Sequence, residues 1–481
     1  MSSGDSRLFS RRGFLGSCAA APWVRTAAAA PRRNVVFIIA DDLNTEVDCY
    51  GSRNTTTPNI DRLARKGVVF QQNHCQFPLC QPSRASLLSG RRPDTTGVYT
   101  LKTPTRIRMK DTIFLPEFFR RNGYYTAHAG KVYHTGEAAE DPRSWDEELR
   151  EFGKTPPPEA VIRKVKANGP KGHTFEWDVL NYTDAQMPDG IMAHRAVSYI
   201  EKAVRMGKPF FVGAGFRRPH APYAAPKPYF DRHPWQKTSL PDNPPGQFAK
   251  LLKAAINYAP PDKPLTEEQV REFRAAYFSC VDFVDAQVGV VLDAVDRLDL
   301  WKNTVVVFCA DHGYHLGDHG GLWHKLSLFE NATRVPLIVY APDLPGNGHA
   351  CGRLTESVDL YPTLTELCGF DAPPGLEGTS FVPLLRDPAR KWKRGAFCMV
   401  GRGNELAEAP EHIVFFGRSV RTEQWRFTEW DGGKQGDELY DHQADPGELN
   451  NLAGKSAHAG TMKNLRALLH EGWRSALPDS A

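Results

Sequence analysis

Short, uninterrupted runs of apolar and β-branched residues recur along this 481-residue chain and constrain its fold more than any other feature. The clearest runs cover residues 34–40, 208–215, 304–310 and 335–340. A run of this kind has no polar face, so it fits a strand that is buried on both sides of a sheet. We therefore predict an α/β fold in which helices cover both faces of a large mixed, mostly parallel sheet.

Patterns typical of helices separate the apolar runs. Thr266 and Gln269 form a capping box just after Leu265, which predicts the start of a long helix. Apolar side chains then recur at helical spacing, at Phe273, Tyr277, Val281, Val284, Val288 and Val291. A shorter helix is expected directly after Cys80, closed by Gly90.

Three parts of the chain lack this alternation. Residues 137–190 and 223–263 are polar or rich in proline, and we expect loops and short elements there. From about residue 393, short strand patterns alternate with Gly-rich turns. That pattern indicates a small C-terminal α+β subdomain with an antiparallel sheet.

The first 30 residues differ in composition from the rest. Arg11 and Arg12 precede a weakly apolar, alanine-rich run. This order is typical of a twin-arginine export signal, so we expect a periplasmic or extracellular protein; a basic N-terminus without signal function is the alternative. The expected organisation is an export signal at 1–30, a main domain at 31–392 and the C-terminal subdomain at 393–481.

Composition excludes several classes of protein. Hydrophobic residues make up 41% of the chain and charged residues 24%, which argues against wholesale disorder. A net charge of +4 gives no reason to expect nucleic-acid binding, and no later segment has the roughly 20 apolar residues of a membrane span. Nine cysteines without a Cys-x-x-Cys pair argue against a zinc knuckle, but leave one or two disulfides open.

Charged and polar side chains follow several of the predicted strands. Asp41 and Asp42 come directly after one run and Asp311 after another, while Lys131 and His220 follow two further runs. Because ligands bind at the carboxyl ends of strands in open α/β sheets, we expect these side chains to share one crevice. Cys80, at the start of its helix, would lie in the positive field of the exposed backbone N–H groups. That field favours an oxyanion or a sulfate.

The run Cys80-Gln81-Pro82-Ser83-Arg84, followed by a short apolar helix, resembles the signature of type I sulfatases, whose cysteine is oxidised to formylglycine. Flanking blocks extend the resemblance over roughly residues 34–455, and they are most similar to the iduronate-2-sulfatases: Gly130-Lys131-Val132-Tyr133-His134, Arg218-Pro219-His220-Ala221-Pro222 and Asp311-His312-Gly313-Tyr314-His315. The resemblance implies an alkaline-phosphatase-like fold, with residues 31–392 as the catalytic domain.

The resemblance also implies a calcium site. Asp41, Asp42, Asp311 and His312 would bind one Ca²⁺, with the formylglycine at Cys80 as a further ligand. Carboxylate oxygens suit calcium, whereas an imidazole is less expected there, and many relatives carry Asn at the position of His312.

Five further residues acquire catalytic roles by the same resemblance. Arg84 would hold the formylglycine hydrate, and Lys131 and Lys325 would bind the sulfate oxygens. His134 would take the proton that releases sulfate, and His220 would protonate the leaving alcohol. These types match the chemistry, because a sulfate ester needs cations, a preorganised nucleophile and a general acid.

The expected function is hydrolysis of a sulfated sugar, in particular a 2-sulfated uronate of a glycosaminoglycan or related polysaccharide. A formylglycine-generating enzyme or an anaerobic sulfatase-maturing enzyme would be its partner in maturation. The alternatives are a phosphonate or phosphate monoester hydrolase of the same superfamily, an aryl or choline sulfatase, and an inactive carbohydrate-binding relative.

Overall fold

A computed structural model describes residues 32–136, 139–150, 157–169, 174–258, 264–404 and 412–478, and residues 31–481 group into one compact unit. The expected export signal at 1–30 lies outside the described residues. Within these ranges every helix is too short or too polar to cross a lipid bilayer.

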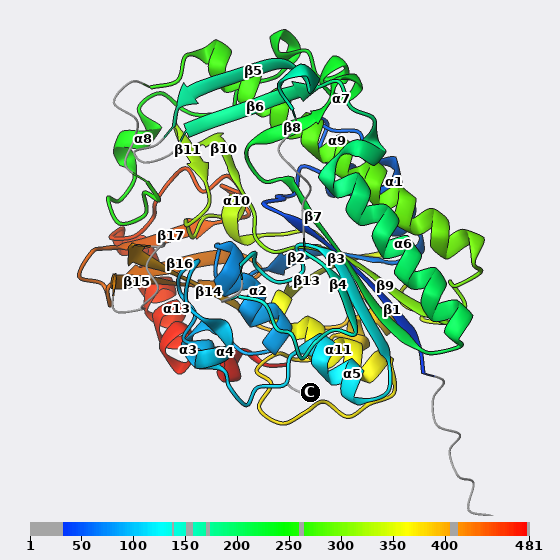
Figure 1. Ribbon diagram of the computed structural model, residues 1–481. Helices are drawn as coiled ribbons and strands as arrows, with labels where there is room; N and C mark the ends of the chain where they lie inside the picture. The colour runs from blue at the N-terminus through cyan, green and yellow to red at the C-terminus, as the bar shows by residue number, and fades with distance from the viewer. Residues whose placement is uncertain are drawn as a thin grey trace, which may run out of the picture. The chain divides into compact units, whose positions relative to one another are not determined.

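An eight-stranded sheet forms the centre of the molecule (Figure 1). Neighbours run parallel, except that β12 is antiparallel to the strand on either side. The order across the sheet is β13 (Ala350–Glu356), β2 (Val68–His74), β12 (Leu337–Tyr340), β9 (Thr304–Ala310), β1 (Asn34–Asp41), β7 (Phe210–Pro219), β3 (Tyr125–Gly130) and β4 (Glu147–Leu149). The predicted large, mostly parallel sheet is confirmed.

The alternation of side chains along β1 explains why its sequence is apolar throughout. Val36 and Ile38 belong to a core beneath α1 (Pro58–Lys66), α6 (Pro188–Met206) and α9 (Glu267–Arg297). Val35 and Phe37 belong to a second core on the opposite face, beneath α2 (Cys80–Ser89), α5 (Leu115–Arg121) and α11 (Leu360–Leu367). Each such side chain contributes about 1.5–3 kcal/mol on full burial, so both faces of the strand must be apolar.

The long helix α9 begins where the capping box predicts. The Thr266 hydroxyl accepts the backbone N–H of Gln269 at 3.2 Å. The helix continues six residues past Val291, the last apolar position in the predicted pattern, and ends at Arg297. The predicted helix at Cys80 is also present, with Cys80 itself as its first residue.

The segment 137–190 was expected to hold loops and short elements, and this prediction missed two longer paired strands. β5 (Val161–Asn168) and β6 (Thr174–Leu180) pair antiparallel, and β8 (Tyr223–Pro226) runs parallel to β6 in a three-stranded sheet. Charged residues on the exposed side of β5 conceal it from a search for apolar runs. Lys166, for example, forms an ion pair with Glu176 of β6 at 3.2 Å.

The C-terminal part forms the expected antiparallel sheet. Its four strands follow chain order: β14 (Ala396–Gly403), β15 (Ile413–Arg421), β16 (Trp425–Trp430) and β17 (Asp437–Asp441). α13 (Ala459–Glu471) packs on it through Leu465, which contacts Val420 and Phe427 in a small separate core.

Short elements connect these layers. They are α3 (Pro93–Thr96), α4 (Thr105–Arg108), α7 (Lys227–Arg232), α8 (Gln247–Lys250), β10 (His315–Asp318), β11 (Leu322–His324), α10 (Glu330–Thr333) and α12 (Val382–Arg386). The eight cysteines in the described ranges all carry free thiols, so none of the disulfides left open by the sequence is formed among them.

Candidate active site

Four adjacent strands of the large sheet end at one edge, and most of the candidate residues lie there. β9, β1, β7 and β3 are neighbours and run parallel. Asp41 is the last residue of β1, Asp311 follows β9 and Lys131 follows β3. The parallel direction of these strands is what brings residues from distant parts of the sequence together.

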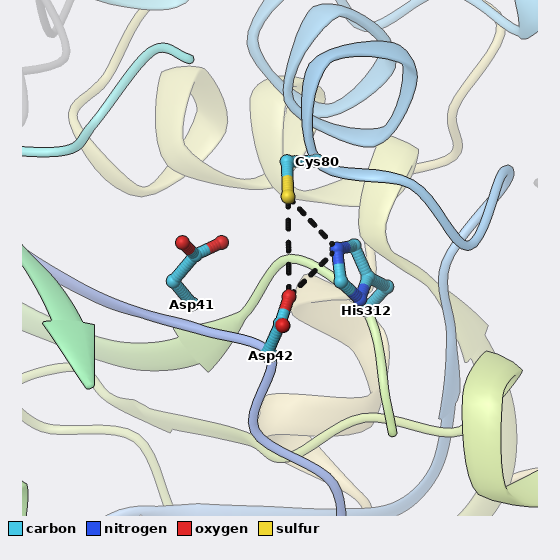
Figure 2. Close-up of side chains that lie close together, drawn as sticks. All are labelled: Asp41, Asp42, Cys80 and His312. Atoms are coloured by element: carbon cyan, nitrogen blue, oxygen red, sulfur yellow. Dashed lines mark hydrogen bonds and ion pairs between the residues drawn. The ribbon is translucent and has the colours of Figure 1, made fainter. Parts of the chain in front are cut away.

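Cys80 lies within this group at the N-terminus of α2. It is only 1% exposed, and its thiol points at Asp42 and His312 (Figure 2). The Sγ atom lies 3.0 Å from Lys325 Nζ, 3.3 Å from His312 Nε2 and 3.9 Å from Asp42 Oδ1. A buried cysteine usually behaves as a small apolar side chain, so this polar environment is unusual.

The charges around Cys80 favour an anion at its position. Burial opposes ionisation of the thiol, but the positive charges of Lys131, Lys325 and His312 outweigh it and hold the pKa of Cys80 well below its usual range. The site therefore stabilises negative charge at the side chain of residue 80.

Arg84 lies one helical turn after Cys80 and is buried with it. Its Nε donates to Asp311 Oδ2 at 2.8 Å, and its terminal nitrogens donate to Asp41 Oδ1 at 3.4 Å and to the carbonyl of Val132 at 3.0 Å. Burial alone would lower the pKa of Arg84, but the two carboxylates hold it above its usual value. Arg84 thus joins α2 to the ends of β1, β3 and β9.

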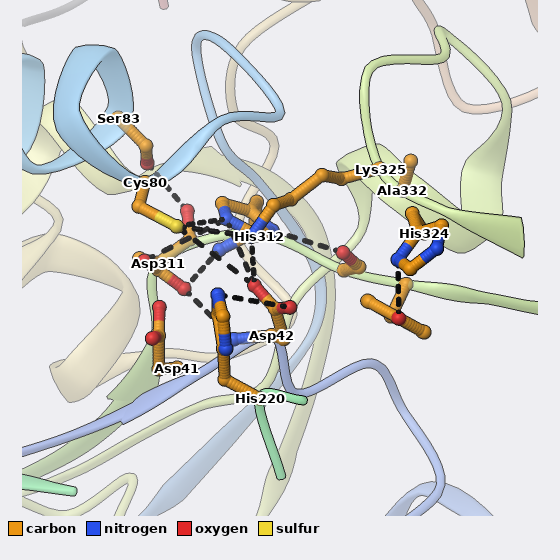
Figure 3. A network of polar contacts seen from close by, with 12 residues as sticks. Asp41, Asp42, Cys80, Ser83, His220, Asp311, His312, His324, Lys325 and Ala332 are labelled. Carbon is orange, nitrogen blue, oxygen red and sulfur yellow. Dashed lines mark hydrogen bonds and ion pairs between the residues drawn. The ribbon is translucent and has the colours of Figure 1, made fainter. Parts of the chain in front are cut away.

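The turn at Asp42 is held from several sides. Asp42 adopts a left-handed backbone conformation with φ 61°, which is uncommon outside glycine, asparagine and aspartate. Asp311 Oδ1 accepts the backbone N–H of Asp42 at 3.2 Å and that of His312 at 2.9 Å. Lys325 Nζ lies 2.5 Å from Asp42 Oδ1 (Figure 3). These contacts fix the direction of the Asp42 carboxylate.

Lys131, His134 and His220 complete the group. Lys131 Nζ forms an ion pair with Asp41 Oδ2. Burial lowers the pKa of His134, and the charges of Cys80 and Asp41 oppose that shift. His220 Nε2 lies 3.9 Å from Asp42 Oδ2, and its side chain is 28% exposed, so it marks the side of the site that is open to solvent (Figure 3).

Four of the five residues expected to bind calcium have their potential ligand atoms close together. Potential ligand atoms of Asp41, Asp42, Cys80 and His312 all lie within 4.8 Å of each other. Asp311 is engaged instead by Arg84 and by backbone N–H groups. Two buried carboxylates supply oxygen ligands of the kind that divalent cations prefer, so the donor set fits such an ion.

Two supporting residues were not identified as such from the sequence. Tyr277 of α9 donates its hydroxyl to the Asp42 carbonyl at 2.8 Å and accepts the N–H of Asn44 at 3.1 Å. Ser83 of α2 donates to the carbonyl of Asp311. Tyr277 was counted as an apolar position of a helix, and its spacing carries no sign of the hydroxyl's role. Ser83 lies inside the Cys80 motif, which was the available signal.

Comparison with protein-family models identifies the family. The model described as "Sulfatase" matches residues 33–370, which is well over half of the chain. The chain belongs to the sulfatase family. A second model, described as "N-sulphoglucosamine sulphohydrolase, C-terminal", matches residues 317–474 of this sulfatase and so includes the antiparallel sheet.

Individual relatives agree with this assignment. The sulfatase is 31% identical to iduronate 2-sulfatase of Mus musculus, over 91% of this chain and 94% of the relative. It is 27% identical to the Δ4,5-hexuronate-2-O-sulfatase of Bacteroides thetaiotaomicron, over 95% of this chain and 91% of the relative. The chain is therefore a hydrolase of sugar sulfate esters, and its resemblance to iduronate-2-sulfatases is confirmed.

A solved structure confirms the expected fold. The phosphonate monoester hydrolase of Agrobacterium radiobacter superposes on this sulfatase with a TM-score of 0.76, covering 92% of this chain and 96% of the other, at 22% identity. At that identity the likeness concerns the fold alone.

Proposed function

We propose that this sulfatase removes sulfate from a 2-sulfated uronate of a glycosaminoglycan or related polysaccharide, through a formylglycine formed from Cys80 and with one calcium ion. The observation that carries the proposal is the environment of the Cys80 side chain. It is buried at a helix N-terminus, with Lys325 Nζ at 3.0 Å and His312 Nε2 at 3.3 Å.

These surroundings fit a more polar group than a thiol. A thiol is a weak donor and a weak acceptor, yet cationic, imidazole and carboxylate groups all face it here. A formylglycine hydrate at this position would supply one hydroxyl as the nucleophile and a second whose deprotonation lets sulfate depart.

The side chains around position 80 would stabilise the charge that develops during hydrolysis. Negative charge gathers on the sulfate oxygens and on the leaving oxygen as the ester bond breaks, and fixed cations in a buried site stabilise it strongly. In this proposal Lys131 and Lys325 bind the sulfate oxygens, and Arg84 orients the hydrate.

Calcium fits the carboxylates on the other side of the site. Asp41, Asp42, Asp311 and His312 would hold the ion together with residue 80, and bound calcium would polarise the sulfate group. Because Lys131 and Lys325 already contact Asp41 and Asp42, these lysines are positioned where a sulfate beside the ion would need them.

Two histidines can move protons at the site. Burial lowers the pKa of His134, so its ring is neutral at pH 7 and able to take the proton that accompanies sulfate release. His220 lies on the partly exposed side, where a leaving alcohol would depart, and we assign it the general-acid role.

The assignment of a 2-sulfated uronate is supported by the names of the two relatives described above, both 2-sulfatases. Aryl and choline sulfates are the alternatives among sulfate esters, and a phosphonate or phosphate monoester is the alternative outside them. The phosphonate hydrolase shares the fold at 22% identity, which does not favour that alternative over a sulfate ester.

Mass spectrometry of the Cys80 peptide from protein made in its own host tests the nucleophile. We expect loss of the sulfur and the mass of an aldehyde or its hydrate. The peptide with Cys309, a buried cysteine on β9, is the internal control and should keep its thiol. An unmodified Cys80 throughout would remove the proposed nucleophile.

A substrate panel tests the specificity. Sulfate release should be fastest from a 2-sulfated uronide disaccharide and much slower from aryl sulfate, choline sulfate and a phosphonate monoester. Faster turnover of any of the other three would replace the proposed substrate. Sugar binding without turnover by protein with a modified Cys80 would favour the carbohydrate-binding alternative.

The proposal also includes export of the protein from the cytoplasm. Residues 1–30 would direct the folded protein through the twin-arginine route, with 31–392 as the catalytic domain and 393–481 as the C-terminal subdomain. Replacing Arg11 and Arg12 together by lysine should retain the protein in the cytoplasm. Unchanged export of that variant would exclude the signal.

A further inference from the structure

We propose that His128, Glu140 and Glu148 form a second cation site, for a divalent transition metal such as Zn²⁺, which ties the loop after β3 to β4. The three residues come from β3, from the following loop and from β4. Potential ligand atoms of the three lie within 4.8 Å of one another. None of them belongs to the catalytic group around Cys80.

The His128 ring is oriented as a ligand. Its Nδ1 lies 3.1 Å from the carbonyl of Gly130, and because a carbonyl can only accept, Nδ1 carries the hydrogen. In a neutral ring this leaves a lone pair on Nε2. A backbone carbonyl that holds the other ring nitrogen in this way is typical of histidines that bind metals. Packing against Trp145, with ring centroids 4.6 Å apart, also holds the ring in place.

Two carboxyl groups lie near His128 Nε2, and burial raises the pKa of one of them, Glu140, to about 8, so a bound cation would displace its proton. His128 Nε2 lies 3.5 Å from Glu148 Oε2 and makes no hydrogen bond within the described residues. Glu140 is 6% exposed, and its buried Oε2 likewise has no hydrogen-bond partner there. Ligands of a tetrahedral zinc ion lie roughly 3.3 Å apart, given bonds of about 2.0–2.1 Å. The observed 3.5 Å is close to that spacing.

The chemistry of the donors distinguishes this site from the calcium site. One imidazole nitrogen with two carboxylate oxygens suits zinc and similar borderline metals, whereas calcium prefers oxygen ligands. Glu148 is the outermost of the three, with its side chain 33% exposed, which leaves access for the ion and for a water ligand. Its other oxygen accepts Arg150 at 2.5 Å, so that arginine orients the carboxylate.

The consequence would be a cross-linked loop. All three ligands lie within residues 128–148, and Lys131 and His134 lie inside the segment that the metal would close. Closing a loop of this length removes conformational freedom from the unfolded chain and restrains the folded one. The metal would therefore position two residues of the catalytic group without touching the substrate.

Metal binding by the full-length mature protein tests the inference, with calcium in excess so that the site at Cys80 is occupied. Zn²⁺ titration by calorimetry should show one tight site, and Co²⁺ should give a visible absorption band without the near-ultraviolet band of a cobalt–thiolate bond. Glu140→Gln and Glu148→Gln should each weaken binding at least about tenfold, since loss of even a residue that only orients a metal ligand costs about 10–100-fold.

Glu147→Gln is the matched control, because Glu147 lies next to Glu148 on β4 but pairs with Lys202 at 2.5 Å. It should bind Zn²⁺ like the wild type. Glu140 is buried, so its variant could fail to fold, which circular dichroism would show. In that case the variant of the partly exposed Glu148 tests the proposal. Absence of Zn²⁺ binding by the wild type, equal binding by Glu148→Gln, or a cobalt–thiolate band would each overturn the proposal.

Discussion

Two buried clusters of charge in this sulfatase are built in different ways. Around Cys80, Lys131, Lys325 and His312 each contact a carboxylate of Asp41 or Asp42, and they also bring positive charge to one shared thiol. Where the antiparallel sheet meets α10, arginines and glutamates contact one another directly. Arg426 lies 2.5 Å from Glu448, His442 lies 2.9 Å from the same carboxylate, and Arg421 lies 3.3 Å from Glu330.

The difference separates a structural network from a reactive site. A buried ion pair with satisfied hydrogen bonds holds elements together, and removal of one partner is strongly destabilising. At Cys80 the paired cations also point toward one shared buried position, where they can stabilise an anion in a transition state. Variants in the two clusters should therefore fail in different assays.

Replacing Cys80 should have the largest effect. Cys80→Ala removes the thiol group that oxidation to formylglycine starts from, so the proposed nucleophile cannot form and we expect sulfate release to fall at least about 10³-fold. Stability should change little, because one small side chain is lost. Initial rates and urea unfolding check both parts. Residual activity within tenfold of the wild type would contradict the proposed role of residue 80.

Breaking the ion-pair network where the antiparallel sheet meets α10 should lower stability and leave activity unchanged. Glu448→Gln removes a carboxylate that pairs with Arg426 and His442, and breaking a buried pair costs about 3–5 kcal/mol of unfolding free energy. Urea unfolding measures the loss, while kcat per folded molecule should stay unchanged.

Glu423→Gln provides the matched control for that variant. Glu423 pairs with Arg353 at 2.7 Å, but its side chain is 58% exposed. An exposed pair contributes about 0–1 kcal/mol, so this variant should unfold almost like the wild type. Equal losses in the two variants would mean that burial does not distinguish the pairs.

Glu438 is a buried carboxyl group whose hydrogen-bond partners are neutral, and it should make the free energy of unfolding depend on pH. Glu438 accepts hydrogen bonds from Trp430 and from Tyr440, each at 2.8 Å, and burial raises its pKa to about 7. Between pH 4.5, the ordinary pKa of a glutamate, and pH 7, the folded state binds more protons than the unfolded state. The free energy of unfolding should therefore fall as pH rises through this range.

Glu438→Gln isolates this contribution, because an amide can keep both hydrogen bonds without titrating. The difference in stability between variant and wild type should shift by up to about 3 kcal/mol across that pH range, from about 1.4 kcal/mol per pKa unit. Urea unfolding at a series of pH values measures it. Parallel curves for the two proteins would show that Glu438 is not the responsible group.

The smallest effect is expected at the support of the Asp42 turn. Tyr277→Phe removes the hydroxyl that bonds the Asp42 carbonyl and the Asn44 N–H, which should cost about 1 kcal/mol of stability and lower kcat roughly fivefold. Tyr340→Phe also loses a hydrogen bond to a carbonyl, that of Trp301 at 2.9 Å, but away from the site. It should lose stability and keep its kcat; an equal loss of kcat would refute a local role for Tyr277.

The sequence predicted those elements whose burial alone determines which residue types they contain. A strand buried on both faces must be apolar throughout, so β1, β7 and β9 were recognisable, and their ends located Asp41, Asp42 and Asp311. The hairpin of β5 and β6 escaped because its charged face resembles a loop in composition. Tyr277 escaped because a residue with an apolar ring and a polar tip fits a helical core pattern equally well.

The burial of Cys80 has a consequence for the order of events in the life of the protein. Asp42 and Lys325, which contact each other next to its thiol, are 283 residues apart in the chain, so the enclosure exists only after most of the polypeptide has folded. Once it is complete, residue 80 is 1% exposed and out of reach of another enzyme. Under the proposed maturation, the modifying enzyme must meet an unfolded chain, and a folded-protein exporter must come second. Catalytic competence would then be decided in the cytoplasm, during a time window set by the folding rate.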